Sequence, residues 1–164
     1  MAAAVFEAVE HGDPAWRDLD IRVLPGITAM LAASAACGAP LGHDFCAINL
    51  SDNLKPGELI DKRLRLAAEA DFAMAFYNPS SKSRPEGFKK ALKTLKECCS
   101  DNRPMIFARN VSRPDQTIKI VPLQETTPDM ADMQTMVIVG SSRTRILPRA
   151  AGDVIYTPRS VPAG

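Results

Sequence analysis

Short apolar segments that end directly in turn-forming residues constrain the fold of this chain more than any other feature. Between residues 20 and 108 these segments alternate with stretches of helical period, whereas those from residue 117 onward follow one another without long helices. The first pattern is typical of strands joined by helices, and the second allows neighbouring strands to run in opposite directions. We therefore predict an α/β fold, a mixed-sheet α/β/α sandwich rather than an all-parallel sheet.

The element boundaries follow from periodicity and from helix-capping residues. Thr28 is placed to cap the helix that follows it, Gly38 to end that helix, and Ser83 with Glu86 to form a capping box. Alternating residues at 117–121 predict a half-exposed edge strand. The predicted helices are 2–10, 29–37, 56–70 and 84–99, and the predicted strands are 20–24, 45–50, 71–77, 104–108, 117–121, 133–140 and 152–157.

Length, charge and cysteine spacing argue against several classes of function. The 164 residues carry a net charge of +1 and contain no run of ~18 apolar residues, unlike a general nucleic-acid binder or a membrane-spanning chain. The motifs GxxxxGK[ST], GxGxxG and GxSxG do not occur. The four cysteines form no CxxC pair and the chain has two histidines, so we predict no metal site and buried free thiols in a reducing cytoplasm.

Four of the strand exits are candidate binding segments. They are residues 25–29, 77–79, 109–111 and 140–142, each with small polar or turn-forming residues. Ligands of α/β proteins gather where strands end, so we expect one preformed site that binds mainly through the main chain. The alternative is that these are ordinary turns, which favour the same residues. Thr28 likewise either only caps its helix or also helps that helix end to bind a carboxylate or phosphate.

Charged loop residues supply the remaining candidates. His43 beside Asp44 is a possible acid–base group, with a merely solvated loop histidine as the alternative. Basic residues near the strand exits are suited to a polyanionic small molecule, unless they are scattered surface charge. These basic residues are Lys82, Arg84, Arg109, Arg113, Arg143 and Arg145.

Five stretches, in this order and spacing, together resemble the tetrapyrrole methylase family: VLPGITAM, GAPLGHDFCAINLSD, FYNPSSKSRPEGF, ARNVSRP and MVIVGSSRTR. The resemblance runs from Met1 to Thr157–Ser160. The first stretch is shared across the family. The second and third resemble the branch that methylates and contracts the macrocycle in cobalamin biosynthesis, and they leave open whether the substrate is the cobalt-free one of the aerobic route or the cobalt-containing one of the anaerobic route.

The resemblance implies a methyltransferase that uses S-adenosyl-L-methionine (SAM) as methyl donor, has two α/β domains, binds a tetrapyrrole and forms a homodimer. It implies no metal, nucleic acid or membrane. The implied cofactor contacts, mostly through the main chain, are Thr28, Ala29, Tyr77, Asn78, Asn110, Val111 and Gly140. His43 is the candidate catalytic residue, and the candidate substrate contacts are Asp44, Lys82, Arg84 and Arg113.

The chain departs from the family pattern at two places. Val111-Ser112 stands where the family often has Ala-Gly, so we expect the branched Val111 to crowd a ligand that approaches the backbone. The GxGPG and GDPG motifs of the first domain are missing. Gly12-Asp13-Pro14 is not the second motif, because it follows the first predicted helix, whereas the family motif precedes that helix.

The missing motifs predict that residues 1–27 are a remnant of an N-terminal methylase domain and that residues 28–164 form the C-terminal methylase domain. The helix at 2–10 has no capping residue before it, which also suggests that structure precedes Met1. We expect this chain alone to bind SAM weakly or not at all. The remaining alternative is a non-catalytic α/β module that dimerises.

Overall fold

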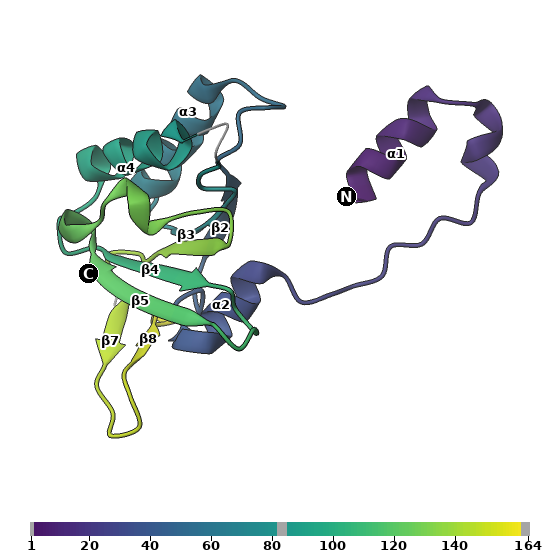
Figure 1. The fold of residues 1–164 in the computed structure, drawn as a ribbon. Coiled ribbons are helices and arrows are strands. Elements are labelled where there is room, and N and C mark those ends of the chain that lie inside the picture. Colours follow the sequence, from purple (N-terminus) through teal and green to yellow (C-terminus); the bar gives the residue numbers. More distant parts are fainter. Residues whose placement is uncertain (1, 82–84, 162–164) are drawn as a thin grey trace.

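The computed structural model describes residues 2–81 and 85–161, and these residues form two parts. An N-terminal segment holds α1 (Ala2–His11) and η1 (Pro14–Asp18), and an α/β body begins at α2 (Ala29–Cys37), as Figure 1 shows. Residues 19–28 join the two parts as chain without helix or strand. Among the described residues, none before Ala33 is buried, so the N-terminal segment adds nothing to the core.

The body is built on a five-stranded mixed sheet in the order β2-β3-β6-β4-β5. Its strands are β2 (Phe45–Asn49), β3 (Ala73–Tyr77), β4 (Pro104–Arg109), β5 (Thr117–Pro122) and β6 (Thr135–Val139). β2 and β3 are parallel, β6 is antiparallel to both of its neighbours, and β5 is antiparallel to β4. We call the end of the sheet at which β2, β3 and β4 terminate the 'exit end', and we call the other end of the sheet the 'opposite end'. β5 and β6 begin at the exit end.

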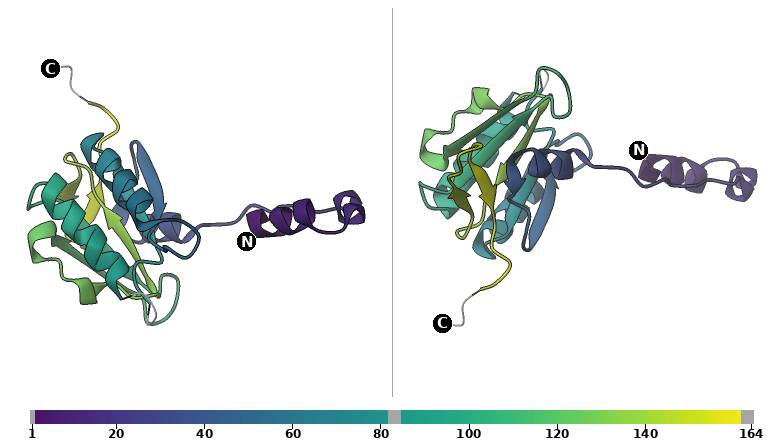
Figure 2. Two further views of the ribbon diagram at one scale, coloured as in Figure 1. Left: turned by 90° about the horizontal axis from the view of Figure 1, so that it is seen from above. Right: turned by 90° about the horizontal axis from the view of Figure 1, so that it is seen from below.

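Two layers cover this sheet, as the two views of Figure 2 show. α3 (Gly57–Glu69) and α4 (Glu86–Cys98) lie side by side on one face. The other face is covered by α2 and by a small sheet of β1 (Gly38–Ala39), β7 (Arg145–Leu147) and β8 (Val154–Tyr156). Two 3-10 turns, η2 (Leu123–Glu125) and η3 (Pro128–Met130), follow β5. The predicted α/β fold with a mixed sheet is confirmed, and β5 is an edge strand as expected.

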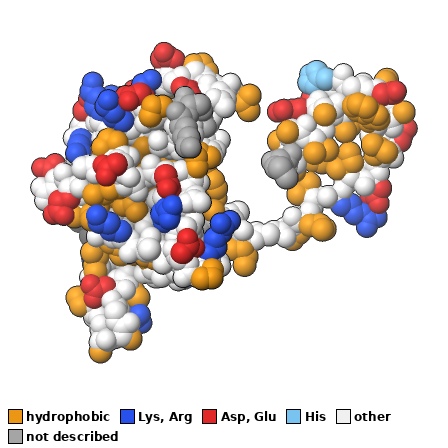
Figure 3. All heavy atoms as spheres, viewed as in Figure 1, with side chains coloured by type: hydrophobic (Ala, Val, Ile, Leu, Met, Phe, Trp, Pro, Cys, Tyr) orange, Lys and Arg blue, Asp and Glu red, His pale blue; other side chains and the backbone are white. Residues whose placement is uncertain are grey.

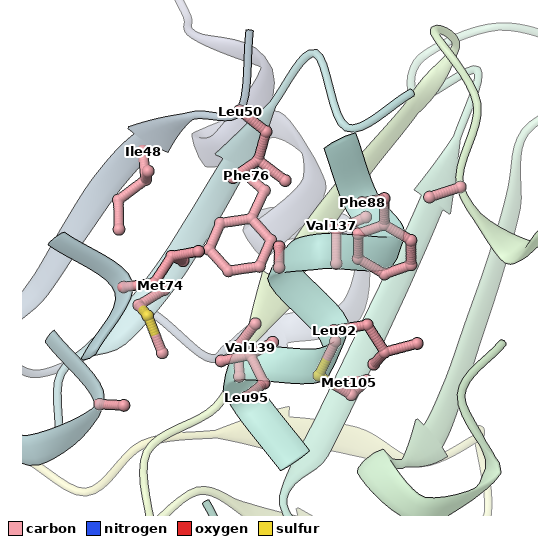
Figure 4. Close-up of a cluster of buried hydrophobic side chains, with 14 of the residues drawn as sticks. Ile48, Leu50, Met74, Phe76, Phe88, Leu92, Leu95, Met105, Val137 and Val139 are labelled. Carbon is pink, nitrogen blue, oxygen red and sulfur yellow. The ribbon is translucent and has the colours of Figure 1, made fainter. Parts of the chain in front are cut away.

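Alternation along β3 explains why the two faces carry different helices. Met74 and Phe76 belong to the hydrophobic cluster beneath α3 and α4, shown in Figure 4, whereas Ala73 and Ala75 belong to the cluster beneath α2. The alanines leave room for an alanine-rich helix to approach the sheet closely. On the larger cluster, Phe88 of α4 meets Phe107 of β4 edge to face with 6.0 Å between ring centroids.

The end of α2 shows why Gly38 is a glycine. Its φ of 136° lies in a region that other residues rarely adopt, and a Cβ there would lie 2.2 Å from the carbonyl oxygen of Ile155 in β8. Gly38 thus ends α2, as predicted, and at the same time pairs with the small sheet. That second role depends on a strand more than one hundred residues away and was not foreseen.

Three other expectations need correction or fall outside the description. The strand predicted at 20–24 is wrong, because no described strand lies beside this segment to share hydrogen bonds with it. All four cysteines are free, but the prediction of buried thiols holds fully only for Cys37, because Cys46 and Cys99 are partly exposed and Cys98 is exposed. The predicted capping box cannot be followed, because Ser83 lies outside the described residues.

The N-terminal segment exposes apolar side chains. Figure 3 shows hydrophobic atoms gathered over it, and Val5, Phe6 and Trp16 are each nearly half exposed. Within residues 2–81 and 85–161, no helix is both long and apolar enough to cross a membrane.

Candidate functional site

A cavity of about 340 Å³ lies at the exit end of the sheet. The start of α2, the turns that follow β3 and β4, and the first residues of β6 form its wall. Its lining residues are Ala29, Ala32, Tyr77, Asn78, Ala108, Asn110, Val111, Arg113, Met133, Gln134, Thr135 and Met136. The structure thus brings together five of the seven predicted cofactor contacts and one predicted substrate contact, Arg113.

Asn78 and Asn110 each begin a turn in the left-handed region, with φ of 52° and 51°. Asparagine tolerates this conformation better than most residues, which explains its place directly after β3 and after β4. The Asn78 side chain donates a hydrogen bond to Oδ1 of Asn49, the last residue of β2, at 3.1 Å. The exits of two neighbouring strands are therefore fastened to each other.

The polar groups of Asn110 form hydrogen bonds with other residues of the chain. Its N–H donates to the carbonyl of Gln134 at 3.1 Å, its carbonyl accepts from the N–H of Arg113 at 3.0 Å, and its side chain donates to Asp115 at 2.6 Å. These bonds shape the turn and leave few groups of Asn110 for a ligand. Val111 and Arg113 are better placed to contact one.

The start of α2 is held by Thr28 and Tyr77. The Thr28 hydroxyl accepts a hydrogen bond from the N–H of Leu31 at 3.4 Å, so the predicted cap is confirmed. The Tyr77 hydroxyl accepts from the N–H of Met30, also at 3.4 Å, and joins the helix start to β3. Thr28 does not line the cavity itself, although Ala29 next to it does.

Residues 133–136, which lead into β6 and begin it, form a wall of the cavity that the sequence did not predict. Met133, Gln134, Thr135 and Met136 line the cavity because β6 is antiparallel to β3 and β4, so that its start lies beside their ends. The expected site contained only residues that follow strands. The available signal was the polar pair Gln134-Thr135 directly before an apolar run, and its meaning depends on strand direction.

A polar network fastens this β6 start to the end of β4. Asp132 accepts hydrogen bonds from Nε of Arg109 at 3.2 Å, from the N–H of Gln134 at 2.9 Å and from the hydroxyl of Thr135 at 2.7 Å. Partial burial raises the pKa of Asp132, but the hydrogen bonds outweigh it and hold that pKa below its ordinary value. The carboxylate is therefore charged at neutral pH.

Gly140 does not share the cavity, so the expectation that all four strand exits converge is wrong at this position. β6 runs from the exit end to the opposite end, where the N–H of Gly140 donates to the carbonyl of Pro104 at 2.8 Å. A Cβ on Gly140 would lie 2.7 Å from the Thr144 side chain. Close packing, rather than a ligand, accounts for this glycine.

His43 and Asp44 also lie away from the cavity, because they precede β2 at the opposite end. The five residues of β2 span about 16 Å at ~3.3 Å per residue. The two side chains are 3.9 Å apart, and Asp44 is largely exposed. The structure therefore does not support His43 as an acid–base group, or Asp44 as a substrate contact, at this cavity.

The predicted basic patch is divided. Arg109 and Arg113 lie at the exit end, whereas Arg143 and Arg145 follow β6 at the opposite end. Lys82 and Arg84 lie outside the described residues. Among the described lining residues, Arg113 is the one cationic side chain.

Comparison with known proteins yields relatives over most of the chain. Residues 2–127 match the family described as Tetrapyrrole (Corrin/Porphyrin) Methylases. A precorrin-3B C(17)-methyltransferase of Sinorhizobium sp is 52% identical over 160 residues, which is 97% of this chain and 63% of the relative. A probable cobalt-factor III C(17)-methyltransferase of Methanocaldococcus jannaschii is 41% identical over 149 residues, 87% of this chain and 58% of the relative.

Solved structures agree with this assignment. The methyltransferase CobJ is 58% identical, with a TM-score of 0.90, over 96% of this chain and 64% of CobJ. Uroporphyrin-III C-methyltransferase of Thermus thermophilus, in complex with S-adenyl homocysteine, has the same fold at 19% identity and a TM-score of 0.55, over 85% of this chain and 56% of that one. The chain thus spans less than two thirds of the length of these relatives. By its matched residues and its fold, the chain belongs to the tetrapyrrole methylase family.

Proposed function

We propose that the cavity at the exit end binds SAM and that the chain takes part in methyl transfer to carbon 17 of precorrin-3B, with ring contraction, in cobalamin biosynthesis. One observation carries the proposal. Ala29, Tyr77, Asn78, Asn110 and Val111 were assigned to the cofactor by family resemblance, and they line one cavity although three separate segments contribute them.

The residues present fit this ligand. The volume of about 340 Å³ is within the usual range of small-molecule sites. Alanines at positions 29, 32 and 108 leave space for a flat ring system, and the start of α2 offers the positive end of a helix to a carboxylate. Val111 lines the cavity while packing against the cluster beneath α2, so its branched side chain forms part of the wall.

When bound, SAM supplies an electrophilic methyl group. The chain's part is to hold and orient the reacting molecules and to exclude water. Three alanines and the turns that follow β3 and β4 form part of the wall that would hold them. Arg113 is exposed at the rim, where its guanidinium is suited to a carboxylate of the tetrapyrrole.

Binding is tested with S-adenosylhomocysteine by NMR titration of the whole chain. We expect weak binding, with shift changes concentrated at Ala29, Val111 and Met136. Ala32→Leu fills the cavity and should abolish these changes, whereas Ala35→Leu, at an exposed position of the same helix outside the cavity, should leave them intact. Shift changes at the opposite end of the sheet, or changes that persist in Ala32→Leu, would contradict the cavity as the cofactor site.

The second candidate substrate is cobalt-factor III, which is favoured by relatives named for it at 36–41% identity. The 52% identity to the precorrin-3B enzyme favours the cobalt-free substrate. Transfer of labelled methyl from SAM to each substrate, compared side by side, decides between them. Transfer to neither would favour the third candidate, a non-catalytic module that dimerises.

We also propose the division into residues 1–27 and 28–164, cytoplasmic location and pairing of two copies. The burial pattern supports the division, since buried residues begin only at Ala33. The free thiols are consistent with a reducing compartment. Light scattering after size-exclusion chromatography tests the pairing, and a monomer at micromolar concentration would contradict it.

A further inference from the structure

We propose that Asp132 is a positioning residue of the cavity: it acts through Arg109, Gln134 and Thr135 to hold two walls of the cavity in register. The two walls are the turn after β4 and the first residues of β6. Only the measurement of ligand binding described below rests on the proposed function; the measurements on the ligand-free chain do not.

The contacts of Asp132 join both walls without touching the cavity. Its Oδ2 accepts from Arg109, the last residue of β4, and its Oδ1 accepts from the N–H of Gln134 and the hydroxyl of Thr135 at the start of β6. Asp132 is not a lining residue, whereas Gln134 and Thr135 are. Its influence on a ligand therefore passes through its neighbours.

Gln134 carries this restraint on to the asparagine turn. Its side chain accepts a second hydrogen bond from Arg109, and its carbonyl accepts the N–H of Asn110, at 3.1 Å. Asn110 begins the turn that places Val111 and Arg113 at the cavity. Asp132 thus contacts Arg109 and Gln134, and Gln134 in turn contacts Asn110.

Two oxygens are needed for this role, which is why a carboxylate suits it. An amide at position 132 would keep one acceptor for Gln134 and Thr135 but present an NH₂ group to Arg109. The Arg109 and Asp132 side chains are 43% and 51% exposed, so their pairing contributes little to global stability. Loss of the carboxylate should therefore loosen the cavity while the fold remains.

The test compares Asp132→Asn with Asp129→Asn. Asp129 is an exposed carboxylate three residues away that is paired with Thr127, so it is a matched control. In the ligand-free chain we expect the Asn110 amide to exchange with solvent at least tenfold faster in Asp132→Asn, and at the wild-type rate in Asp129→Asn. Amides at the centre of the sheet, such as those of Phe107 and Val137, should keep their protection, which a general loss of stability would not allow.

Two further measurements complete the test. Arg109→Gln should accelerate exchange at Asn110 similarly, and the double variant should exceed neither single variant, because both act in one network. With S-adenosylhomocysteine at one fixed concentration, shift changes at Val111 and Met136 should fall by at least half in Asp132→Asn.

The outcomes distinguish this inference from the proposed function. Wild-type exchange at Asn110 in Asp132→Asn, or additive effects in the double variant, would overturn the role of Asp132 whether or not the ligand binds. If the wild-type chain shows no ligand-induced shifts, the proposed function loses its support, and the exchange measurements still decide the role of Asp132.

Discussion

The two ends of the central sheet are held together in different ways. At the opposite end, Arg103 is only 6% exposed and pairs with Asp71 at 2.7 Å, and the hydroxyls of Thr144 and Thr157 are buried against each other at 2.7 Å. At the exit end, polar side chains such as Arg109 and Asp132 are about half exposed around an open cavity. One end is closed by buried polar contacts, and the other is left open.

This difference suggests that residues at the opposite end contribute mainly to the stability of the fold and residues at the exit end mainly to the shape of the cavity. Polar groups buried away from water must keep their partners, so changes at the opposite end should destabilise the whole fold. Arg109 and Asp132 at the exit end are partly hydrated, so changes to them should act on the cavity more than on the fold. Asn110 and Thr135 at the same end are buried, so changes to them should also cost some stability. The following predictions test that separation.

The largest effect should come from Arg103→Leu. The Arg103 guanidinium donates to Asp71 and to the carbonyl of Gly140 at 3.2 Å. Removing it takes this donor from the Gly140 carbonyl and leaves the Asp71 carboxylate without its cationic partner, with Ser142 as the remaining donor. We expect a loss of about 3 kcal/mol in the free energy of unfolding, measured with urea. Arg65→Leu, which removes a half-exposed arginine between Asp61 and Glu97, should cost less than about 1 kcal/mol. Equal losses in the two variants would contradict the contrast.

Thr157→Val should come next. The Thr157 hydroxyl is buried and bonds to Thr144 and to the carbonyl of Pro40, so an isosteric methyl removes a hydrogen-bond partner from each. Thr144 still accepts from the N–H of Ser141. We expect a loss of about 2 kcal/mol, from urea or thermal unfolding. Thr117→Val, at an exposed position on edge strand β5, is the control and should be neutral.

Asn110→Ala should have a smaller effect on stability and a clear one on the cavity. Alanine at a φ of 51° is strained and loses the bond to Asp115, which together should cost about 1–2 kcal/mol. Asn110→Gly relieves the strain, so it should recover part of the stability but not the Asp115 bond. If the two variants unfold at the same urea concentration, backbone strain is not what asparagine relieves here.

Acid sensitivity should be traceable to the opposite end. Partial burial raises the pKa of Asp71, but hydrogen bonds from Ser142 and Arg103 outweigh it and hold that pKa below its ordinary value. Because the pKa of Asp71 is lower in the folded chain than in the unfolded one, its carboxylate stabilises the fold at pH values above the unfolded pKa of about 3.9. This stabilisation is lost as the pH falls through the pKa of the folded state. We expect Asp71→Asn to be less stable than wild type at pH 7 and to lose less stability below about pH 4. Urea titrations between neutral and acid pH measure this, and Asp153→Asn, at an exposed site, should follow wild type.

Most elements were predictable because their signals are local. Thr28 and Gly38 bound α2 as expected, and the apolar stretch of β3 is buried as expected. The segment at 20–24 was not predictable in this way, because an extended sequence becomes a strand only when another strand lies beside it. β7 was missed for the related reason that its three residues are all exposed and carry no apolar alternation.

The candidate site was predictable to the extent that it follows strands running in one direction. Tyr77, Asn78, Asn110 and Val111 were found because β3 and β4 both end at the cavity. Gly140 was misplaced, and Gln134 and Thr135 were missed, because the residues of β6 alone do not indicate whether this strand runs parallel or antiparallel to its neighbours.

The sequence by itself therefore determined the kinds of element, their turns and the family, because capping, periodicity and motif residues act over a few positions. Only the tertiary structure decided which turns meet, because hydrogen bonds between distant strands set their direction. A single antiparallel strand, β6, moved Gly140 away from the cavity and brought Gln134 into it.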